Sequence, residues 1–159
     1  MRKQKGFSLI ELLIVVAIIL IIAAIAIPNL LRSRIAANEA SAVGSIRTIN
    51  TAEVTYASTY PTQGFGTSTQ LGPSTDGTVT SAAGGLIDSV LASGTKSGYV
   101  FLVAVGGGTP LTTYTTNGDP QNSQTGQRHF CSDQSGVIRY DAAAITSGGT
   151  ACTTGLPLQ

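Results

Sequence analysis

Residues 7–27 read FSLIELLIVVAIILIIAAIAI, an apolar run that a single carboxylate, Glu11, interrupts near its start. A helix over this run would rise about 31 Å, which matches the roughly 30 Å hydrocarbon core of a bilayer. A carboxylate at the centre of such a segment is disfavoured by about 2.5 to 3.5 kcal/mol, and by less near the interface, so it indicates a function and a partner. The nearest candidate partner lies one helical turn upstream, at Phe7.

The residues on either side of this run form a recognisable motif. A short leader, residues 1–6, contains three basic side chains and ends at Gly6, which is followed by Phe7-Ser8-Leu9-Ile10-Glu11. Pro28 closes the apolar run. This combination closely resembles the N-terminus of a type IV prepilin. The resemblance is strong over residues 1–60 and only general beyond them.

The resemblance implies a processing pathway and a filament. In that family a prepilin peptidase cuts after the glycine, here Gly6, and methylates the new N-terminal amine, here that of Phe7. Glu11 would then neutralise the Phe7 amine of a neighbouring subunit during assembly. The implied partners are the inner membrane, the peptidase, the pilus assembly platform and further copies of the chain in a helical filament. The precursor would sit in the inner membrane with its N-terminus in the cytoplasm, and the product would be an extracellular pilus.

The resemblance also implies an α+β pilin fold, in which a long N-terminal helix packs on a C-terminal antiparallel sheet. One departure from the family concerns the middle of the apolar run, where many members have a glycine and this chain has Leu20. Glycine lowers helix stability by about 1 kcal/mol relative to alanine, so its absence favours a firmer helix before Pro28. Pro28 lacks an amide proton and its ring opposes the carbonyl one turn back, so we expect a kink there.

Two other kinds of N-terminus share parts of this pattern. A secretory signal peptide would use Ala24-Ile25-Ala26 as its cleavage site, but the apolar run exceeds the 7 to 15 residues typical of such a core. A plain signal anchor needs only apolar length and the basic leader to place its N-terminus inside. It leaves Gly6 and Glu11 unexplained.

The composition suits one small domain joined to a membrane segment. The chain has 159 residues, of which 42% are hydrophobic and 11% charged. Without its leader the chain has six basic and eight acidic side chains, a balance of about −2. Bulk charge therefore does not indicate a nucleic-acid partner, although it leaves a local patch open. No catalytic constellation is present, because His129 is the only histidine and lies beside Phe130 in a predicted strand.

The two cysteines, Cys131 and Cys152, lie in the part of the chain that would be outside the membrane, where disulfides form and persist. We expect them to pair, which would stabilise the fold by about 3 kcal/mol. The resemblance agrees, because type IV pilins commonly fasten their C-terminal region with such a bridge.

A metal site is a weaker interpretation of the same region. Zinc would need more ligands than Cys131 with its neighbours His129 and Asp133, and the usual ligand spacings are absent. Asp119, Asp133 and Asp141 would be the candidate calcium ligands, but no EF-hand spacing occurs. We therefore expect no metal and no cofactor.

The chain divides into five predicted segments: leader 1–6, membrane and filament-core helix 7–28, amphipathic helix 29–60, Thr/Ser/Gly-rich connector 61–97, and disulfide-closed sheet 98–159. The amphipathic helix is predicted from an apolar stripe with helical spacing, formed by Ile35, Ala42, Val43, Ile46, Ile49 and Ala57. Pro61 ends it. Within the connector, residues 86–91 are apolar enough for a short helix.

The sheet is predicted to be an antiparallel meander of about four strands. These strands cover residues 99–105, 111–116, 128–132 and 137–140, which are rich in β-branched and aromatic side chains. Asp133-Gln134-Ser135-Gly136 suits the turn of a hairpin between the last two. The tail from Asp141 is predicted to be irregular and tied back through Cys152.

These observations indicate a structural pilus subunit that polymerises through its N-terminal helix and is not an enzyme. Within the same assembly class, a type II secretion pseudopilin or a minor pilin is the alternative. A membrane-anchored monomeric adhesin or binding module is the alternative from a different class.

Overall fold

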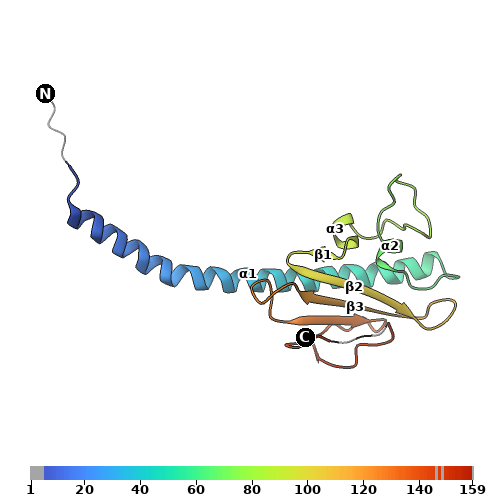
Figure 1. Ribbon diagram of the computed structural model, residues 1–159. Coiled ribbons are helices and arrows are strands. Elements are labelled where there is room, and N and C mark those ends of the chain that lie inside the picture. The colour runs from blue at the N-terminus through green and yellow to red at the C-terminus, as the bar shows by residue number, and fades with distance from the viewer. Residues whose placement is uncertain (1–5, 146, 148, 159) are drawn as a thin grey trace. The chain divides into compact units, whose positions relative to one another are not determined.

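The computed structural model describes residues 6–145, 147 and 149–158 (Figure 1). The predicted leader, apart from Gly6, lies outside the described residues. The chain forms two compact units, Met1–Arg34 and Ile35–Gln159.

Helix α1 (Leu9–Thr59) contributes to both units. It joins most of the predicted membrane helix (7–28) to most of the predicted amphipathic helix (29–60), with Pro28 inside it, and it leaves out Phe7, Ser8 and Tyr60 at its ends. The helix ends at Thr59, just before Pro61, because a residue that precedes proline disfavours the helical conformation. The kink at Pro28 stays a prediction.

In the second unit the chain forms a sheet whose strand order follows the sequence, β1-β2-β3-β4-β5-β6, with every neighbouring pair antiparallel. The meander is therefore confirmed. The predicted number of strands was too low, because short strands at both edges were missed. The strands are β1 (Thr95–Lys96), β2 (Tyr99–Gly106), β3 (Thr113–Pro120), β4 (His129–Asp133), β5 (Arg139–Asp141) and β6 (Leu156–Pro157).

Two further predictions need correction. Strand β3 was predicted at 111–116, but it runs on through Asn117-Gly118-Asp119-Pro120 because these residues pair with β2. The tail beyond Asp141 is not wholly irregular, since β6 pairs with β5.

The connector holds two short helices, α2 (Ser68–Leu71) and α3 (Ser89–Ala92). The side chain and amide of Thr67 and those of Gln70 cap α2 reciprocally, which is a capping box. The Asp88 side chain caps α3 by accepting from the Leu91 amide at 2.8 Å, close to the predicted helix at 86–91.

The core of the second unit lies between α1 and the sheet, which run alongside each other in Figure 1. Four residues of the predicted stripe, Ala42, Val43, Ile46 and Ile49, belong to this core, and Ile46 and Ile49 are almost fully buried. The other two, Ile35 and Ala57, are only partly buried. Gly118 allows the close approach, because a Cβ there would lie 3.2 Å from Ile46 Cδ1 and 3.3 Å from the Phe101 ring. The buried side chains of the core include Ala42, Val43, Ile46, Ile49, Ala52, Tyr56, Leu71, Leu91, Tyr99, Phe101 and Phe130.

The hairpin between β4 and β5 turns as predicted. The Gly136 amide donates to the Asp133 carbonyl at 2.8 Å, and Gly136 has a φ of 74°, which a glycine adopts without strain. The Asp133 side chain accepts from the Ser135 amide at 2.9 Å and completes the turn.

Candidate assembly site

The first unit presents an apolar helix with no cover from its own chain. In the described part of the chain, one helix is long and apolar enough to cross a membrane, and none of the side chains in its apolar window is buried. The exposed side chains occur on all sides of α1 from Leu9 to Leu31. A helix that is apolar all round requires a bilayer or other helices around it.

At the start of α1, Glu11 has a partner that the sequence analysis missed. The Ser8 amide donates to Glu11 Oε2 at 2.9 Å, and both residues are exposed. Ser8 precedes the first helical residue, so Glu11 occupies the third position of the helix and reaches back as in a capping box. The S-x-x-E spacing before an apolar run is the signal that predicts this contact. Glu11 therefore has a local role in helix initiation, which any test of its assembly role must separate.

The predicted cleavage position is open. Phe7 is 85% exposed, and a Cβ added at Gly6 would meet nothing within 4 Å. The fold of this chain therefore neither shields the bond between them nor needs glycine there for space. A requirement for Gly6 would have to come from a processing enzyme.

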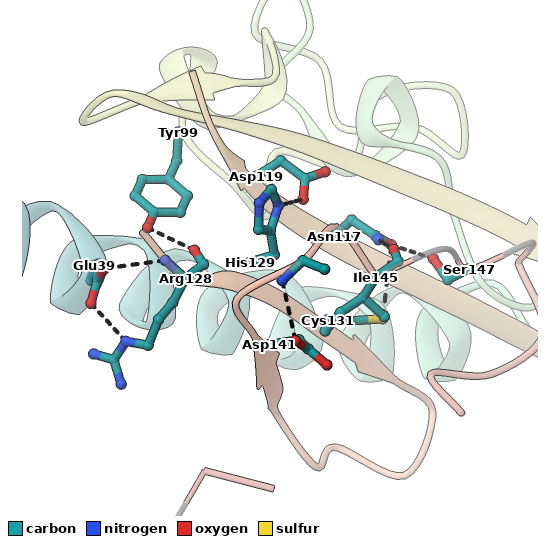
Figure 2. A network of polar contacts seen from close by, with 11 residues as sticks. Glu39, Tyr99, Asn117, Asp119, Arg128, His129, Cys131, Asp141, Ile145 and Ser147 are labelled. Carbon is teal, nitrogen blue, oxygen red and sulfur yellow. Dashed lines mark hydrogen bonds and ion pairs between the residues drawn. The ribbon is translucent and has the colours of Figure 1, made fainter. Parts of the chain in front are cut away.

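In the second unit, Glu39 of α1 clamps the segment that leads into β4. Glu39 Oε1 accepts from the amides of Gln127 and Arg128 at 3.0 and 3.2 Å. Glu39 Oε2 accepts from Arg128 Nε at 2.7 Å (Figure 2). Tyr99 donates from its hydroxyl to the Arg128 carbonyl at 2.9 Å. That hydroxyl occupies the space where a Cβ at residue 126 would be, so the clamp requires Gly126.

Cys131 of β4 and Cys152 form a disulfide with a Cα–Cα distance of 6.0 Å. Asp133 supports it, because Asp133 Oδ2 accepts from the Cys152 amide at 2.9 Å. Burial opposes ionisation of Asp133, but hydrogen bonds from Ser135 and Cys152 outweigh it and lower the pKa of the Asp133 carboxyl. Asn117 of β3 contacts the segment between β5 and Cys152. Its side-chain amide donates to the Ile145 carbonyl, and its side-chain oxygen accepts from the Ser147 hydroxyl (Figure 2).

The candidate metal ligands do not converge. Asp119 Oδ1 lies 2.6 Å from His129 Nδ1, and Asp141 Oδ1 accepts instead from the Ala143 amide at 3.1 Å (Figure 2). Cys131 is in the disulfide, and Asp133 is held at the turn. Across the described ranges, no group of three or more His, Cys, Asp and Glu side chains is placed to hold a metal ion.

A buried carboxylate, Glu53 of α1, was also missed. Its side chain is 0% exposed, Oε2 accepts from the Gly66 amide at 2.8 Å, and Oε1 has no partner among the described residues. Burial raises the pKa of Glu53 to about 7, against the lowering effect of the Gly66 amide. The helical spacing places Glu53 next to the apolar stripe, but its polarity alone predicts an exposed residue.

Comparison with known proteins gives matches to the N-terminal motif and to three curated relatives. Residues 1–27 match the family described as the prokaryotic N-terminal methylation motif. The type IV wide pilus major component PilA4 of Thermus thermophilus is 67% identical over 39 residues, which cover 24% of this chain and 30% of that protein. The type IV major pilin protein PilA of Myxococcus xanthus is 43% identical over 56 residues, 35% of this chain and 26% of that protein.

The third relative belongs to a secretion system. The type II secretion system core protein G of Vibrio cholerae is 42% identical over 65 residues, which cover 39% of this chain and 44% of that protein. The aligned regions thus span less than half of each relative. No solved structure matches the chain significantly. The methylation motif, the exposed apolar helix and the three relatives together support placing this chain among the type IV pilins and pseudopilins.

Proposed function

We propose that this chain is a structural subunit of a type IV pilus that polymerises through the first half of α1. The observation that carries the proposal is the contrast between the two units. The second unit has a closed core between helix and sheet, whereas the apolar side chains of the first unit have no cover. Exposed apolar area of this extent requires partners, which are lipid before assembly and other copies of the helix afterwards.

The driving force for filament assembly and the register between neighbouring subunits come from different parts of the helix. In lipid there is no hydrophobic drive between helices, so apolar side chains associate strongly only once subunits leave the bilayer for a filament core. A head-to-tail contact that does not close on itself yields an open filament. The Phe7 amine, freed by cleavage after Gly6 and N-methylated, would pair with Glu11 of a neighbouring subunit. A misregistered subunit would leave a buried charge unpaired at several kcal/mol.

The Ser8–Glu11 hydrogen bond sharpens the test of this pairing. Glutamine at position 11 retains an acceptor for the Ser8 amide but carries no charge, whereas alanine removes both. We expect Glu11→Gln and Glu11→Ala, each as the only pilin expressed, to be inserted and cleaved normally and to give at least tenfold less sheared extracellular protein than the wild type. Immunoblots of the sheared and membrane-held fractions measure this yield.

The two variants distinguish a helix-capping role of Glu11 from a charge-pairing role in assembly. Filament loss in Glu11→Ala alone would show that helix capping is the role of Glu11. Normal yield from both variants would contradict the proposed assembly role altogether.

A type II secretion pseudopilin is the second candidate, because the Vibrio cholerae relative belongs to that system. The disulfide and the separated carboxylates of the sheet support the pilin instead, since a pseudopilin would more naturally carry a calcium site in place of a bridge. Purified surface filaments whose dominant band is this chain by mass spectrometry would support the major-pilin assignment. Absence of the chain from surface filaments, with loss of secretion on deletion, would favour the pseudopilin.

A monomeric anchored adhesin would need neither cleavage nor Glu11. Its precursor would keep its leader, so N-terminal processing distinguishes it directly. In the proposed pathway the precursor lies in the inner membrane with a cytoplasmic N-terminus, and prepilin peptidase and the assembly platform act on it there.

A further inference from the structure

Two exposed arginines follow the apolar segment of α1 directly. Arg32 and Arg34 come after Leu30 and Leu31, and neither forms an ion pair or a side-chain hydrogen bond with a described residue. The acidic side chain that comes next along the helix, Glu39, is buried and occupied by Arg128. The guanidinium groups of Arg32 and Arg34 are therefore available to a partner outside the chain.

The geometry of the helix restricts what that partner is. Successive residues of an α-helix are turned by about 100°, so Arg32 and Arg34 project from nearly opposite sides. A single neighbouring protein surface contacts one side of a helix and meets one of the two. A layer of anionic groups that surrounds the helix meets both at once.

The distance to Glu11 points to the same layer. From Glu11 to Arg32 an α-helix rises about 31 Å, close to the roughly 30 Å thickness of the hydrocarbon core. Phe7 precedes the first helical residue, Leu9, and so lies beyond Glu11 on the side of the opposite headgroups. With Arg32 in one headgroup layer, Glu11 falls at the far hydrocarbon boundary and avoids the cost of a carboxylate at the bilayer centre.

We propose that Arg32 and Arg34 bind phospholipid phosphates at the outer face of the inner membrane and so hold Glu11 at the inner hydrocarbon boundary before assembly. The inference rests on the proposed function in one respect, that α1 spans a bilayer. Guanidinium groups suit this role because their planar forks bind phosphate oxygens in pairs and their alkyl stems lie along apolar surface.

Cleavage of the leader removes the basic side chains at the cytoplasmic end of the apolar segment. The leader carries Arg2, Lys3 and Lys5 on the cytoplasmic side, and cutting after Gly6 removes all three. Arg32 and Arg34 then remain as the basic side chains next to the apolar run. If α1 shifts outward through the membrane by one helical turn, about 5 Å, the phosphate contacts of Arg32 and Arg34 break and Glu11 enters the hydrocarbon. Both ends of the apolar segment therefore resist premature release of the subunit from the membrane.

Distances from arginine to phosphorus test the proposal in the full mature chain, reconstituted into phosphatidylethanolamine–phosphatidylglycerol vesicles. With ¹³C-labelled arginine, ¹³C–³¹P dipolar dephasing in solid-state NMR detects guanidinium carbons within about 5 Å of phosphorus. We expect dephasing in the wild type and its loss in Arg32→Gln/Arg34→Gln. Arg47→Gln is the matched control, because Arg47 is exposed on the same helix but lies about 20 Å farther along it, and it should keep the dephasing.

A second measurement tests the depth of Glu11. Lipids with a nitroxide at the acyl-chain end should weaken the signals of Ile21 and Ile22 and leave the Glu11 carboxyl carbon largely intact. Equal dephasing in the wild type and the double variant, or equal weakening of Glu11 and Ile21, would overturn the inference while leaving the pilin proposal standing. Failure of the chain to enter the bilayer at all would instead contradict the membrane-spanning step of the proposed function.

Discussion

Glu53 makes the stability of the globular unit depend on pH in a direction opposite to that of a salt-bridged carboxylate. Burial raises its pKa from 4.5 to about 7 in the folded protein. The folded state therefore binds its proton more tightly than the unfolded state. The contribution of protonated Glu53 to the free energy of unfolding is complete at a pH below its ordinary pKa of 4.5. It is lost as the pH rises from there and is gone once the pH passes about 7. A shift of this size corresponds to about 3 kcal/mol in total.

Glu53→Gln removes this dependence while keeping an acceptor for the Gly66 amide. The unfolding free energy of the wild type should fall relative to that of the variant as the pH rises. We expect the difference between the two to grow by about 2 to 3 kcal/mol from pH 5 to pH 9. Urea unfolding of the mature, oxidised chain in a nonionic detergent, followed by tyrosine circular dichroism, measures this difference, and effects of other titrating groups cancel in it.

Asp76→Asn is the matched control for Glu53→Gln. Asp76 is exposed, and hydrogen bonding from the Thr78 amide lowers the pKa of its carboxyl, so it stays ionised over this pH range in both states. If the unfolding free energies of the wild type and Glu53→Gln change with pH in parallel, the reasoning is refuted. That result would mean that Glu53 has the same pKa in the folded and the unfolded chain.

Three further predictions concern processing, the disulfide and the clamp. Intact-protein mass spectrometry should show a mature chain that begins at N-methylated Phe7, and Gly6→Ala should accumulate uncut but membrane-inserted precursor; a wild-type chain that keeps its leader would contradict this. Cys131→Ser should lower the unfolding free energy by about 3 kcal/mol without changing cleavage, and peptide maps showing two free thiols in exported wild-type protein would remove its basis. Arg128→Leu leaves the Glu39 carboxylate buried without its cation, so urea unfolding should show a loss of about 1.5 to 3 kcal/mol, and an unchanged midpoint would mean that the two backbone amides satisfy Glu39 alone.

The sequence predicts the long elements of the fold well, because their signals are local. The apolar stripe of α1 repeats over many turns, and Val100-Phe101-Leu102-Val103 has the β-branched and aromatic residues that favour a strand. The turn after Asp133 is encoded by an aspartate that hydrogen-bonds its own backbone and by a glycine that adopts a positive φ.

The missed features depend on contacts between distant parts of the chain. The residues Asn117 to Pro120 have low strand propensity, and they are extended because β2 supplies their partners. The two-residue strands β1 and β6 are too short for any periodicity to reveal them.

At the candidate site, the residues of the processing motif could be named from the sequence because they are contiguous. The acceptor role of Glu39 and the burial of Glu53 could not be named, because each depends on a segment that is remote in sequence: Gln127 and Arg128 for the first, Gly66 for the second. The contact between Ser8 and Glu11 was within reach, since the S-x-x-E spacing is a known helix-start signal.

The in-order arrangement of the strands has a consequence for the order in which this chain folds. Each strand pairs with the strand synthesised just before it, so no strand waits for a distant partner, and such local pairing favours fast folding. Helix α1, the element on which the sheet packs, emerges first. Cys152 follows strands β1 to β5 in the sequence and precedes only β6. It can therefore close the disulfide over strands that are already paired, so oxidation would act as a late fastening of the subunit and not as a guide for its folding.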